Sequence, residues 1–307
     1  MKLLGVLVLI SACAATGGDE GDALEQESSA TRYVQILDFE GIDQGAWYDA
    51  IHSLNAQFDD ACGDAWCEGD FTNYTPLTFA CSVTSKLGNV KDCAWTFAAS
   101  ETAVDPKTAA IVDDRPTFEC HVAMQTTAKR LAAILAAPDS LYAPLPGAPS
   151  IAEQLGDCFE RPVNLPAVAE GTTYVAASDY YTGPGIDRWL DAKRALVRSF
   201  DDVCGDTFCG SDYGDLTSLE LECAITKSTG NVKGCAWVFG GSYFWVPDDR
   251  SSELVTEHHT YRCDFDVKGT LPQLISTWTA AGTTDAIRRL LPGTPATAYD
   301  ALLGCLP

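Results

Sequence analysis

Positive charge is scarce in this chain. Lys and Arg together number 20 in 307 residues, against 43 Asp and Glu, which gives a formal net charge of -23 at pH 7. Nucleic acids and anionic lipid surfaces are negatively charged themselves and would repel such a protein. The composition therefore excludes both classes of partner and is typical of a soluble surface protein.

The chain also lacks the residue patterns of common hydrolases. It has only four histidines and contains no Gly-x-Ser-x-Gly motif. A serine or cysteine nucleophile needs such an exposed turn or a neighbouring base to become reactive. Pairs of carboxylates are abundant in an acidic chain and identify no glycosidase site without geometry. We therefore expect no enzymatic activity and no catalytic residues.

The apolar run at the N-terminus is too short to cross a bilayer. It extends from Leu3 to Ile10 and is preceded by Lys2, whereas a membrane-spanning helix needs about 20 apolar residues. A short apolar run with a positive charge before it and small residues after it is typical of a targeting segment. Residues 1–12 are therefore predicted to be a signal peptide that is removed.

The end of this leader carries a specific motif. Ile10, Ser11, Ala12 and Cys13 stand in sequence, and this segment resembles the lipobox of bacterial lipoproteins. The resemblance implies that the Cys13 thiol is acylated, with palmitate among its lipids, and becomes the mature N-terminus. Ala14 rather than an aspartate follows, which in Gram-negative lipoproteins implies sorting to the outer membrane. The expected location is the cell envelope, on its periplasmic face or its surface.

A polar segment follows the lipobox. Residues 16–30 are rich in Gly, Asp, Glu and Ser and contain almost no side chains that a core could use. Such a composition cannot bury enough apolar surface to fold. We predict that residues 13–30 form a flexible acidic tether.

The other twelve cysteines form two sets with nearly the same spacing. They are Cys62, Cys67, Cys81, Cys93, Cys120 and Cys158, followed by Cys204, Cys209, Cys223, Cys235, Cys263 and Cys305. The first three intervals are 5, 14 and 12 residues in both sets, and the last two are 27 and 38 against 28 and 42. The pattern indicates a tandem duplication, with one Cys-rich unit at 31–160, a linker at 161–171 and a second unit at 172–307.

The sequence between the cysteines supports the duplication. Residues 58–100 align without a gap at an offset of 142, with about half of the positions identical. No histidine is shared between the two copies, which also disfavours a duplicated catalytic site. The Cys-Gly-Asp segment at 62–64 and the Cys-Ala-Trp segment at 93–95 resemble tandem units of exported bacterial proteins of unknown function. That resemblance implies no activity.

An exported location favours disulfides. An even number of cysteines remains after Cys13, six in each unit, so we expect three bridges per unit, with 15 possible pairings left open. Cys62 and Cys67 are also spaced as half of a zinc site. Without a repeated histidine in an oxidising compartment, disulfides are favoured over zinc.

The apolar spacing predicts the elements of each unit. Trp47, Leu54 and Phe58 belong to a helical stripe that runs into the first cysteine. Alternating residues at 77–83 and 93–97 flank a Gly-Asn turn and predict a hairpin, and 118–122 predicts another strand. Similar patterns recur in the second unit at 189–203, 219–225 and 261–265.

Each unit is expected to end in a helix. A hydroxyl followed three residues later by an acid, as in Ser150 with Glu153 and Thr297 with Asp300, is typical of a helix start. The predicted fold class is α+β, with two tandem homologous domains. Each domain has a helix packed on an antiparallel sheet, a C-terminal helix and stabilising disulfides.

Acidic residues gather around the first two cysteines of each unit. The candidate calcium ligands are Asp60, Asp64, Asp70, Asp202, Asp206 and Asp212. Several carboxylates in a glycine-containing loop supply the oxygen ligands that calcium prefers, although the spacing is not that of an EF-hand. The alternative is that these aspartates cap helix ends and turns. Structural calcium is therefore one hypothesis, and no other cofactor is expected.

The two copies also differ at particular positions. Ile51, His52 and Ala56 of the first copy correspond to Lys193, Arg194 and Arg198, and Glu101, Thr102 and Ala103 correspond to Tyr243, Phe244 and Trp245. An exposed aromatic trio beside cations could bind a partner or the face of a sugar. The alternative is that the trio packs within a strand.

These observations favour one function and leave a second open. The favoured interpretation is that the chain is a non-enzymatic cell-envelope lipoprotein that binds a protein or a glycan through its duplicated domains. The alternative is an exported protease inhibitor or hydrolase that uses a variable loop, at 101–116 or 243–259.

Overall fold

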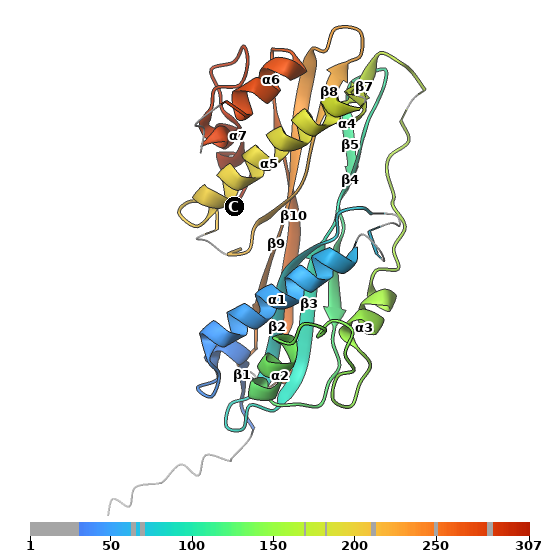
Figure 1. The fold of residues 1–307 in the computed structure, drawn as a ribbon. Helices are drawn as coiled ribbons and strands as arrows, with labels where there is room; N and C mark the ends of the chain where they lie inside the picture. The colour runs from blue at the N-terminus through green and yellow to red at the C-terminus, as the bar shows by residue number, and fades with distance from the viewer. Residues whose placement is uncertain are drawn as a thin grey trace, which may run out of the picture. The chain divides into compact units, whose positions relative to one another are not determined.

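The chain folds into helices and antiparallel sheets. The computed structural model describes residues 31–62, 66–67, 71–168, 170–181, 183–209, 213–248, 251–280 and 285–307. We call residues 31–160 the first half and residues 172–307 the second half. Each half contains a four-stranded antiparallel sheet with a long helix on one face (Figure 1). The predicted α+β class with antiparallel sheets is thus confirmed.

The first half is built on a sheet with the strand order β1-β2-β3-β6. Its strands are β1 (Tyr33–Gln35), β2 (Thr75–Thr84), β3 (Val90–Ala98) and β6 (Thr117–His121). Its helices are η1 (Ile36–Asp38), α1 (Gln44–Cys62), α2 (Ala128–Leu135) and α3 (Ile151–Cys158). Trp47, Leu54 and Phe58 of α1 are buried in the same core as Trp95 of β3, so the predicted helical stripe faces the sheet.

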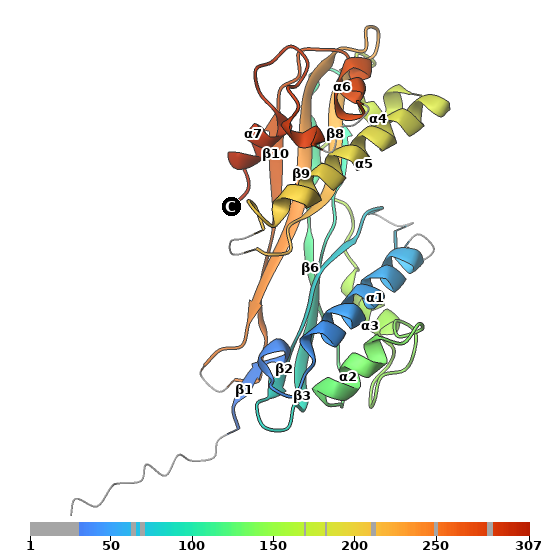
Figure 2. The same ribbon diagram turned by 60° about the vertical axis from the view of Figure 1, so that its left-hand side comes forward.

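The second half is built on a sheet with the strand order β10-β9-β8-β7. Its strands are β7 (Tyr174–Ala176), β8 (Thr217–Thr226), β9 (Val232–Trp245) and β10 (Val255–Phe265). Its helices are α4 (Ala177–Tyr180), α5 (Pro184–Cys204), α6 (Leu271–Trp278), η2 (Ala286–Arg288) and α7 (Ala298–Leu303). Trp189 and Phe200 of α5 share a core with Trp237 of β9. Figure 2 shows α1 and α5 on the same side of their sheets.

Local sequence signals explain where these elements begin and turn. Gly88 and Gly230 have φ values of 65° and 72°, the left-handed region that glycine adopts without steric penalty, in the predicted Gly-Asn turns. The side-chain oxygen of Ser150 accepts a hydrogen bond from the Glu153 amide at the start of α3. The same arrangement at Thr297 starts α7. The predicted hairpins and helix starts are therefore confirmed.

The structure selects one disulfide pairing from the 15 that the sequence left open for each half. The pairs are Cys62 with Cys67, Cys81 with Cys93, Cys120 with Cys158, Cys204 with Cys209, Cys223 with Cys235, and Cys263 with Cys305. Cys81 and Cys93 lie opposite each other on β2 and β3, so their bridge crosses the hairpin. Cys305 lies after α7, because Gly304 caps that helix. The expectation that the last helix carries its cysteine is thus correct for Cys158 and wrong for Cys305.

Each half also extends a two-stranded ribbon beyond its sheet. The first arm, residues 101–114, consists of β4 (Glu101–Val104) and β5 (Ile111–Asp114). The second arm, residues 241–259, continues β9 and β10 beyond Gly240, where the pairing of β9 with β8 ends. These arms contain most of the two segments that the sequence presents as variable loops.

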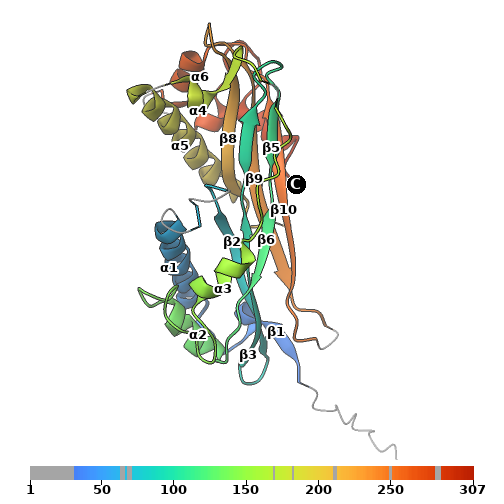
Figure 3. The same cartoon turned by 90° about the vertical axis from the view of Figure 1, so that its right-hand side faces the viewer.

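Each arm covers the sheet of the other half. The contacts join an aliphatic side chain of an arm to small side chains of the opposite sheet: Ile111 to Ala224 and Ala236, and Leu254 to Ala80 and Ala94. Figure 3 shows β5 beside β8 and the lower part of β10 beside β6. Because neighbouring residues of a strand point to opposite faces, each sheet lies between its own long helix and the arm of the other half.

Candidate functional site

A hydrogen-bond network joins the two halves where the arms cross. Ser242 of the second arm donates from its amide to Asp215 Oδ1 at 2.7 Å and from its hydroxyl to Asp215 Oδ2 at 2.6 Å. The Thr96 hydroxyl of β3 lies 2.9 Å from the Ser242 hydroxyl, and the Thr78 hydroxyl of β2 donates to Asp215. The network fixes the loop before β8 and the second arm against the first sheet.

A pocket of about 400 Å³ opens above this network, between α1 and the second arm. We call it the aromatic groove. It is lined by Leu37, Trp47, Tyr48, Ile51, Leu77, Thr78, Phe79, Gly214, Asp215, Ser242, Tyr243 and Phe244. Both halves contribute, since the last five of these residues belong to the second half. The side chain of Gln35 on β1 donates to the Phe244 carbonyl at 3.1 Å and holds the second arm beside the groove.

Two tyrosines of the groove are accessible to solvent. Tyr48 is 61% exposed and Tyr243 is 46% exposed, whereas Trp47 and Phe79 beneath them are buried. The ring of Tyr243 stacks on that of Trp245 with 5.8 Å between centroids. Exposed aromatic rings above a preformed apolar pocket are typical of ligand sites.

The corresponding region of the second half is polar. At an offset of 142, Lys193 takes the position of Ile51, Glu220 that of Thr78, and Glu101 that of Tyr243. Glu220 accepts hydrogen bonds from Thr102 of the first arm at 2.7 Å and from Ser100 at 3.1 Å. Burial raises the pKa of the Glu220 carboxyl, an effect that the Thr102 bond and the nearby Lys193 ammonium partly oppose. Charged and hydrogen-bonded side chains thus stand where the first half has its aromatic groove.

The aromatic trio predicted from the sequence therefore lies in a different setting than expected. We predicted it beside the cations of its own copy, Lys193, Arg194 and Arg198. The structure instead brings Tyr243 and Phe244 to α1 of the first half, because the arms cross. Among the described residues that line the groove there is no Lys or Arg. Sequence reasoning missed Tyr48, which no pattern connects with residue 243.

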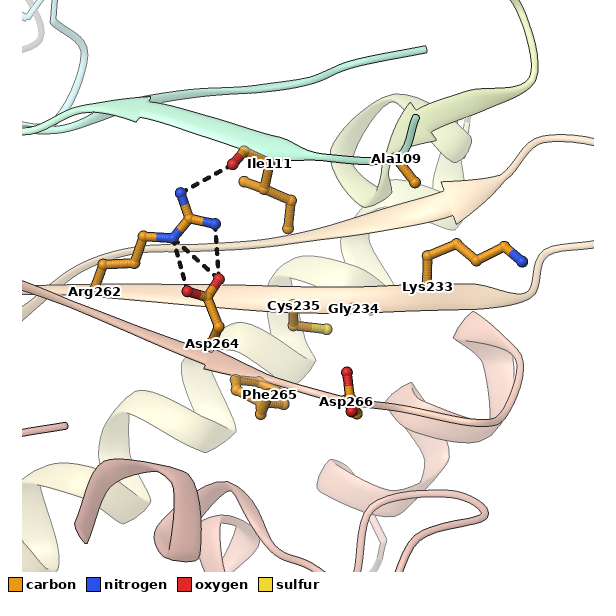
Figure 4. Close-up of a pocket in the computed structure, with 9 residues that line it drawn as sticks. All are labelled: Ala109, Ile111, Lys233, Gly234, Cys235, Arg262, Asp264, Phe265 and Asp266. Atoms are coloured by element: carbon orange, nitrogen blue, oxygen red, sulfur yellow. Dashed lines mark hydrogen bonds and ion pairs between the residues drawn. The ribbon is translucent and has the colours of Figure 1, made fainter. Parts of the chain in front are cut away.

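A second pocket, of about 310 Å³, lies at the tip of the first arm (Figure 4). It is lined by Ala109, Ile111, Lys233, Gly234, Cys235, Arg262, Asp264, Phe265 and Asp266. The Arg262 guanidinium bonds Asp264 at 2.7 Å and also reaches the Ile111 carbonyl and Asp113. The Lys233 ammonium lies 5.8 Å from the ring of Tyr174. Since the charge of Arg262 is already matched by carboxylates, this pocket is the weaker candidate for a ligand site.

A chain of histidines and carboxylates ties the second arm to the first sheet. Nδ1 of His121 lies 3.0 Å from Asp92 and its Nε2 lies 3.1 Å from Glu119. His258 of the second arm approaches Glu119 at 3.6 Å and places its Nδ1 2.7 Å from the Thr117 hydroxyl. Partial burial opposes the charged imidazole of His121, but Asp92 and Glu119 raise its pKa above the ordinary value. The arrangement is an ion-pair network rather than a nucleophile with its base.

This network predicts a pH dependence of stability. Below about pH 6.5, the ordinary histidine value, His121 is protonated in both the folded and the unfolded state, and its ion pairs contribute fully. As the pH rises through the raised pKa of the folded state, the proton is lost and the contribution disappears. We expect His121→Gln to reduce the fall in the free energy of unfolding between pH 6 and pH 8. Urea denaturation at both pH values measures it.

The control for that experiment is His52→Gln, which removes an exposed histidine from α1. It should leave the pH dependence of the wild type unchanged. An equal pH dependence in wild type and His121→Gln would show that the ion pairs of His121 with Asp92 and Glu119 do not stabilise the folded state.

The structure describes three of the six candidate calcium ligands. Asp60 and Asp202 lie on exposed positions near the ends of α1 and α5, and Asp206 is exposed after α5. Asp64, Asp70 and Asp212 lie outside the described residues. In the described ranges, no group of three or more His, Cys, Asp or Glu side chains is arranged to hold a metal ion. Structural calcium therefore stays a prediction.

Other sequence predictions concern residues outside the described part. The signal peptide, Cys13 and the tether all lie in residues 1–30. From Thr31 onward, in the described ranges, no helix is long and apolar enough to cross a membrane. The alternative hypothesis of an inhibitor or hydrolase names the segments at 101–116 and 243–259 as variable loops. Both segments contribute strands to the arms and pack on the opposite sheets.

Comparison of the chain with protein-family models, curated proteins and solved structures gave no match.

Proposed function

We propose that this chain is a non-enzymatic binding protein of the bacterial cell envelope and that the aromatic groove receives its ligand. One observation carries the proposal. Tyr48 and Tyr243 come from different halves, are 61% and 46% exposed, and line the same apolar pocket. A folded protein usually exposes large aromatic side chains together only where they are used.

The groove is suited to binding because its walls are fixed. The hydrogen bonds of Asp215 hold its floor, and the bond from Gln35 to Phe244 holds one side. Trp47 and Phe79 pack beneath it, with ring centroids 6.1 Å apart. A preformed pocket loses little conformational entropy when a ligand enters.

The architecture around the groove is part of the proposal. We infer a tandem duplication with units at 31–160 and 172–307, joined by a linker at 161–171. The same three disulfide pairings in each half, with separations of 5, 12 and 38 residues against 5, 12 and 42, support it. After duplication, the two corresponding regions would have diverged, one with an aromatic groove and the other with charged and hydrogen-bonded side chains.

A thermal shift assay tests the groove. The panel consists of indole, benzyl alcohol, maltose and choline. At ten times its Kd, a compound that binds only the folded chain stabilises it by about 1.4 kcal/mol, or about 3 °C for a protein of this size. We expect such a shift with at least one compound and its loss in the Tyr48→Leu/Tyr243→Leu variant.

The control is Tyr142→Leu, which removes a tyrosine that is 58% exposed but does not line the groove. It should keep the shift. A panel without any shift, or a shift that survives in the double variant, would contradict the proposed site. Potent inhibition of a protease by the purified chain would instead support the alternative function.

The proposed location is the outer membrane, with a lipid on Cys13 and an acidic tether at 13–30. We expect Cys13→Ala to move the protein from the membrane fraction to the soluble fraction, because the thiol is the attachment point of the lipid. Immunoblotting of the separated fractions measures this. Retention of the variant in the membrane fraction would contradict lipid anchoring at this residue.

A further inference from the structure

The polar groups at the floor of the aromatic groove are already engaged within the protein. The Thr78 and Ser242 hydroxyls both donate to Asp215, and the Thr96 hydroxyl meets that of Ser242 at 2.9 Å. A sugar carries many hydroxyls that need partners when they are buried. The hydroxyl protons of Thr78, Thr96 and Ser242 are thus already donated within the protein. The floor of the groove is therefore poorly suited to bind the hydroxyl groups of a glycan.

The charge of the groove points to another kind of ligand. Its lining contains the carboxylate of Asp215 and, in the described residues, no Lys or Arg. The two hydroxyl groups that bond Asp215 do not neutralise its charge. The whole chain carries a formal charge of -23, which attracts cations and raises their concentration near the surface.

The second half shows where a cation stands in the corresponding region. Lys193 of α5 occupies the position of Ile51, and its ammonium attracts the carboxylates of Glu220 and Glu222. In the first half Thr78 and Ala80 take the places of Glu220 and Glu222, and the described lining of the groove holds aromatic rings and Asp215 but no Lys or Arg. A positive group from outside would therefore face the carboxylate of Asp215.

We infer that the aromatic groove binds an organic cation of the quaternary ammonium class. The inference rests on the proposed function and specifies its ligand. Aromatic faces attract a cation through their negative quadrupole, and the methyl groups of a quaternary ammonium ion bury against apolar walls without needing hydrogen bonds. Tyr48 and Tyr243, the exposed tyrosines of the groove, supply the rings and Asp215 the counter-charge.

Isothermal titration of the full-length chain with choline chloride tests the charge requirement. The comparison compound is the uncharged alcohol in which a carbon atom replaces the choline nitrogen, so that shape and apolar surface are nearly unchanged. Both titrations use the same ionic strength, set with sodium chloride. We expect choline to bind about tenfold more tightly than this neutral isostere, the effect of a desolvated cation over aromatic rings.

The chain offers a matched variant for the carboxylate. Asn73, 142 residues before Asp215, accepts from the Ser100 amide through Oδ1 at 2.8 Å and donates from Nδ2 to the Ser100 hydroxyl at 2.8 Å. Asp215→Asn can therefore accept from the Ser242 amide through Oδ1 and donate from Nδ2 to the Ser242 hydroxyl, while it loses the charge and the bond from the Thr78 hydroxyl. We expect this variant to lose most of the preference for choline and to bind the neutral isostere as the wild type does.

The outcomes separate the inference from the proposed function. The inference is overturned if choline and the isostere bind equally, if neither binds, or if Asp215→Asn keeps the full preference. In each of these cases the shifts with indole, benzyl alcohol and maltose, and their loss in Tyr48→Leu/Tyr243→Leu, still decide whether the groove binds a ligand at all.

Discussion

Replacing Cys120 and Cys158 by serine is expected to lower the free energy of unfolding by about 4 kcal/mol, the loop-closure value for a bridge between residues 38 apart. The same change at Cys62 and Cys67, only 5 residues apart, should lower it by about 2 kcal/mol. The difference arises because a long closed loop removes more conformational freedom from the unfolded chain. Urea denaturation of both variants under non-reducing conditions measures it.

The position of the Cys120–Cys158 bridge explains why its loss should destabilise the first half. Cys120 lies on β6 and Cys158 at the end of α3, so the bridge attaches the last helix of the first half to its sheet. Ile151 and Leu155 of that helix are buried in the core. Equal losses in the two variants would show that the loops restrict the unfolded chain to the same extent and would contradict the prediction.

Gly240→Val is expected to destabilise the protein by about 3 kcal/mol, at the upper end of the usual range for overpacking. A Cβ atom at this position would lie 2.6 Å from the Cβ of Ala98, and 3.4 Å and 3.5 Å from Leu77 and Leu219. The neighbouring Cβ belongs to a short, rigid side chain that cannot move aside. The prediction tests the close approach of β9 to the first half, where the second arm begins.

Two variants give that experiment its controls. Ala98→Gly should restore part of the stability that Gly240→Ala loses, because it removes the Cβ atom with which the new alanine collides. Gly156→Ala on the exposed side of α3, where a Cβ meets nothing within 4 Å, should raise stability by about 0.5 to 1 kcal/mol through helix propensity. A tolerated Gly240→Val, without loss of stability, would contradict the crossing of the arms at this point.

Local sequence patterns were sufficient for the long helix, the hairpin and the last helix of each half, but they did not predict α2, α6 or the strands β4 and β5 of the first arm. The spacing of Trp47, Leu54 and Phe58 predicted α1, and the glycine turn at Gly88 predicted the β2–β3 hairpin. These signals work because they depend on residues close in sequence, where one periodicity or one backbone conformation decides the outcome. The pairing of the cysteines was left open because it depends on the distance between elements.

The crossing of the arms was not predictable in the same way. The alternation in β2 predicted a strand, yet it did not say what covers the face that carries Ala80. The contacts are made by Leu254, far away in the sequence. Alanines such as Ala80 and Ala94 on this face were a signal of close packing, but they do not identify the partner.

The candidate site was also only partly predictable from local sequence patterns. The aromatic trio at 243–245 and the position of Ile51 were both found from differences between the two predicted copies. Their meeting in one groove depends on the arm of one half reaching the helix of the other. The sequence thus pointed to some residues of the site, whereas Tyr48, Asp215 and the meeting of the two walls depend on the long-range topology.

Hydrogen exchange with and without a saturating panel compound tests the central claim most directly, because it locates the bound compound on the chain. The account predicts slower exchange at Trp47 to Ile51 and at Ser242 to Phe244, the two walls of the aromatic groove. It predicts no change at Ala109 to Ile111 and Arg262 to Asp266, which line the pocket at the tip of the first arm. Protection at that pocket without protection of the two groove walls would contradict the account.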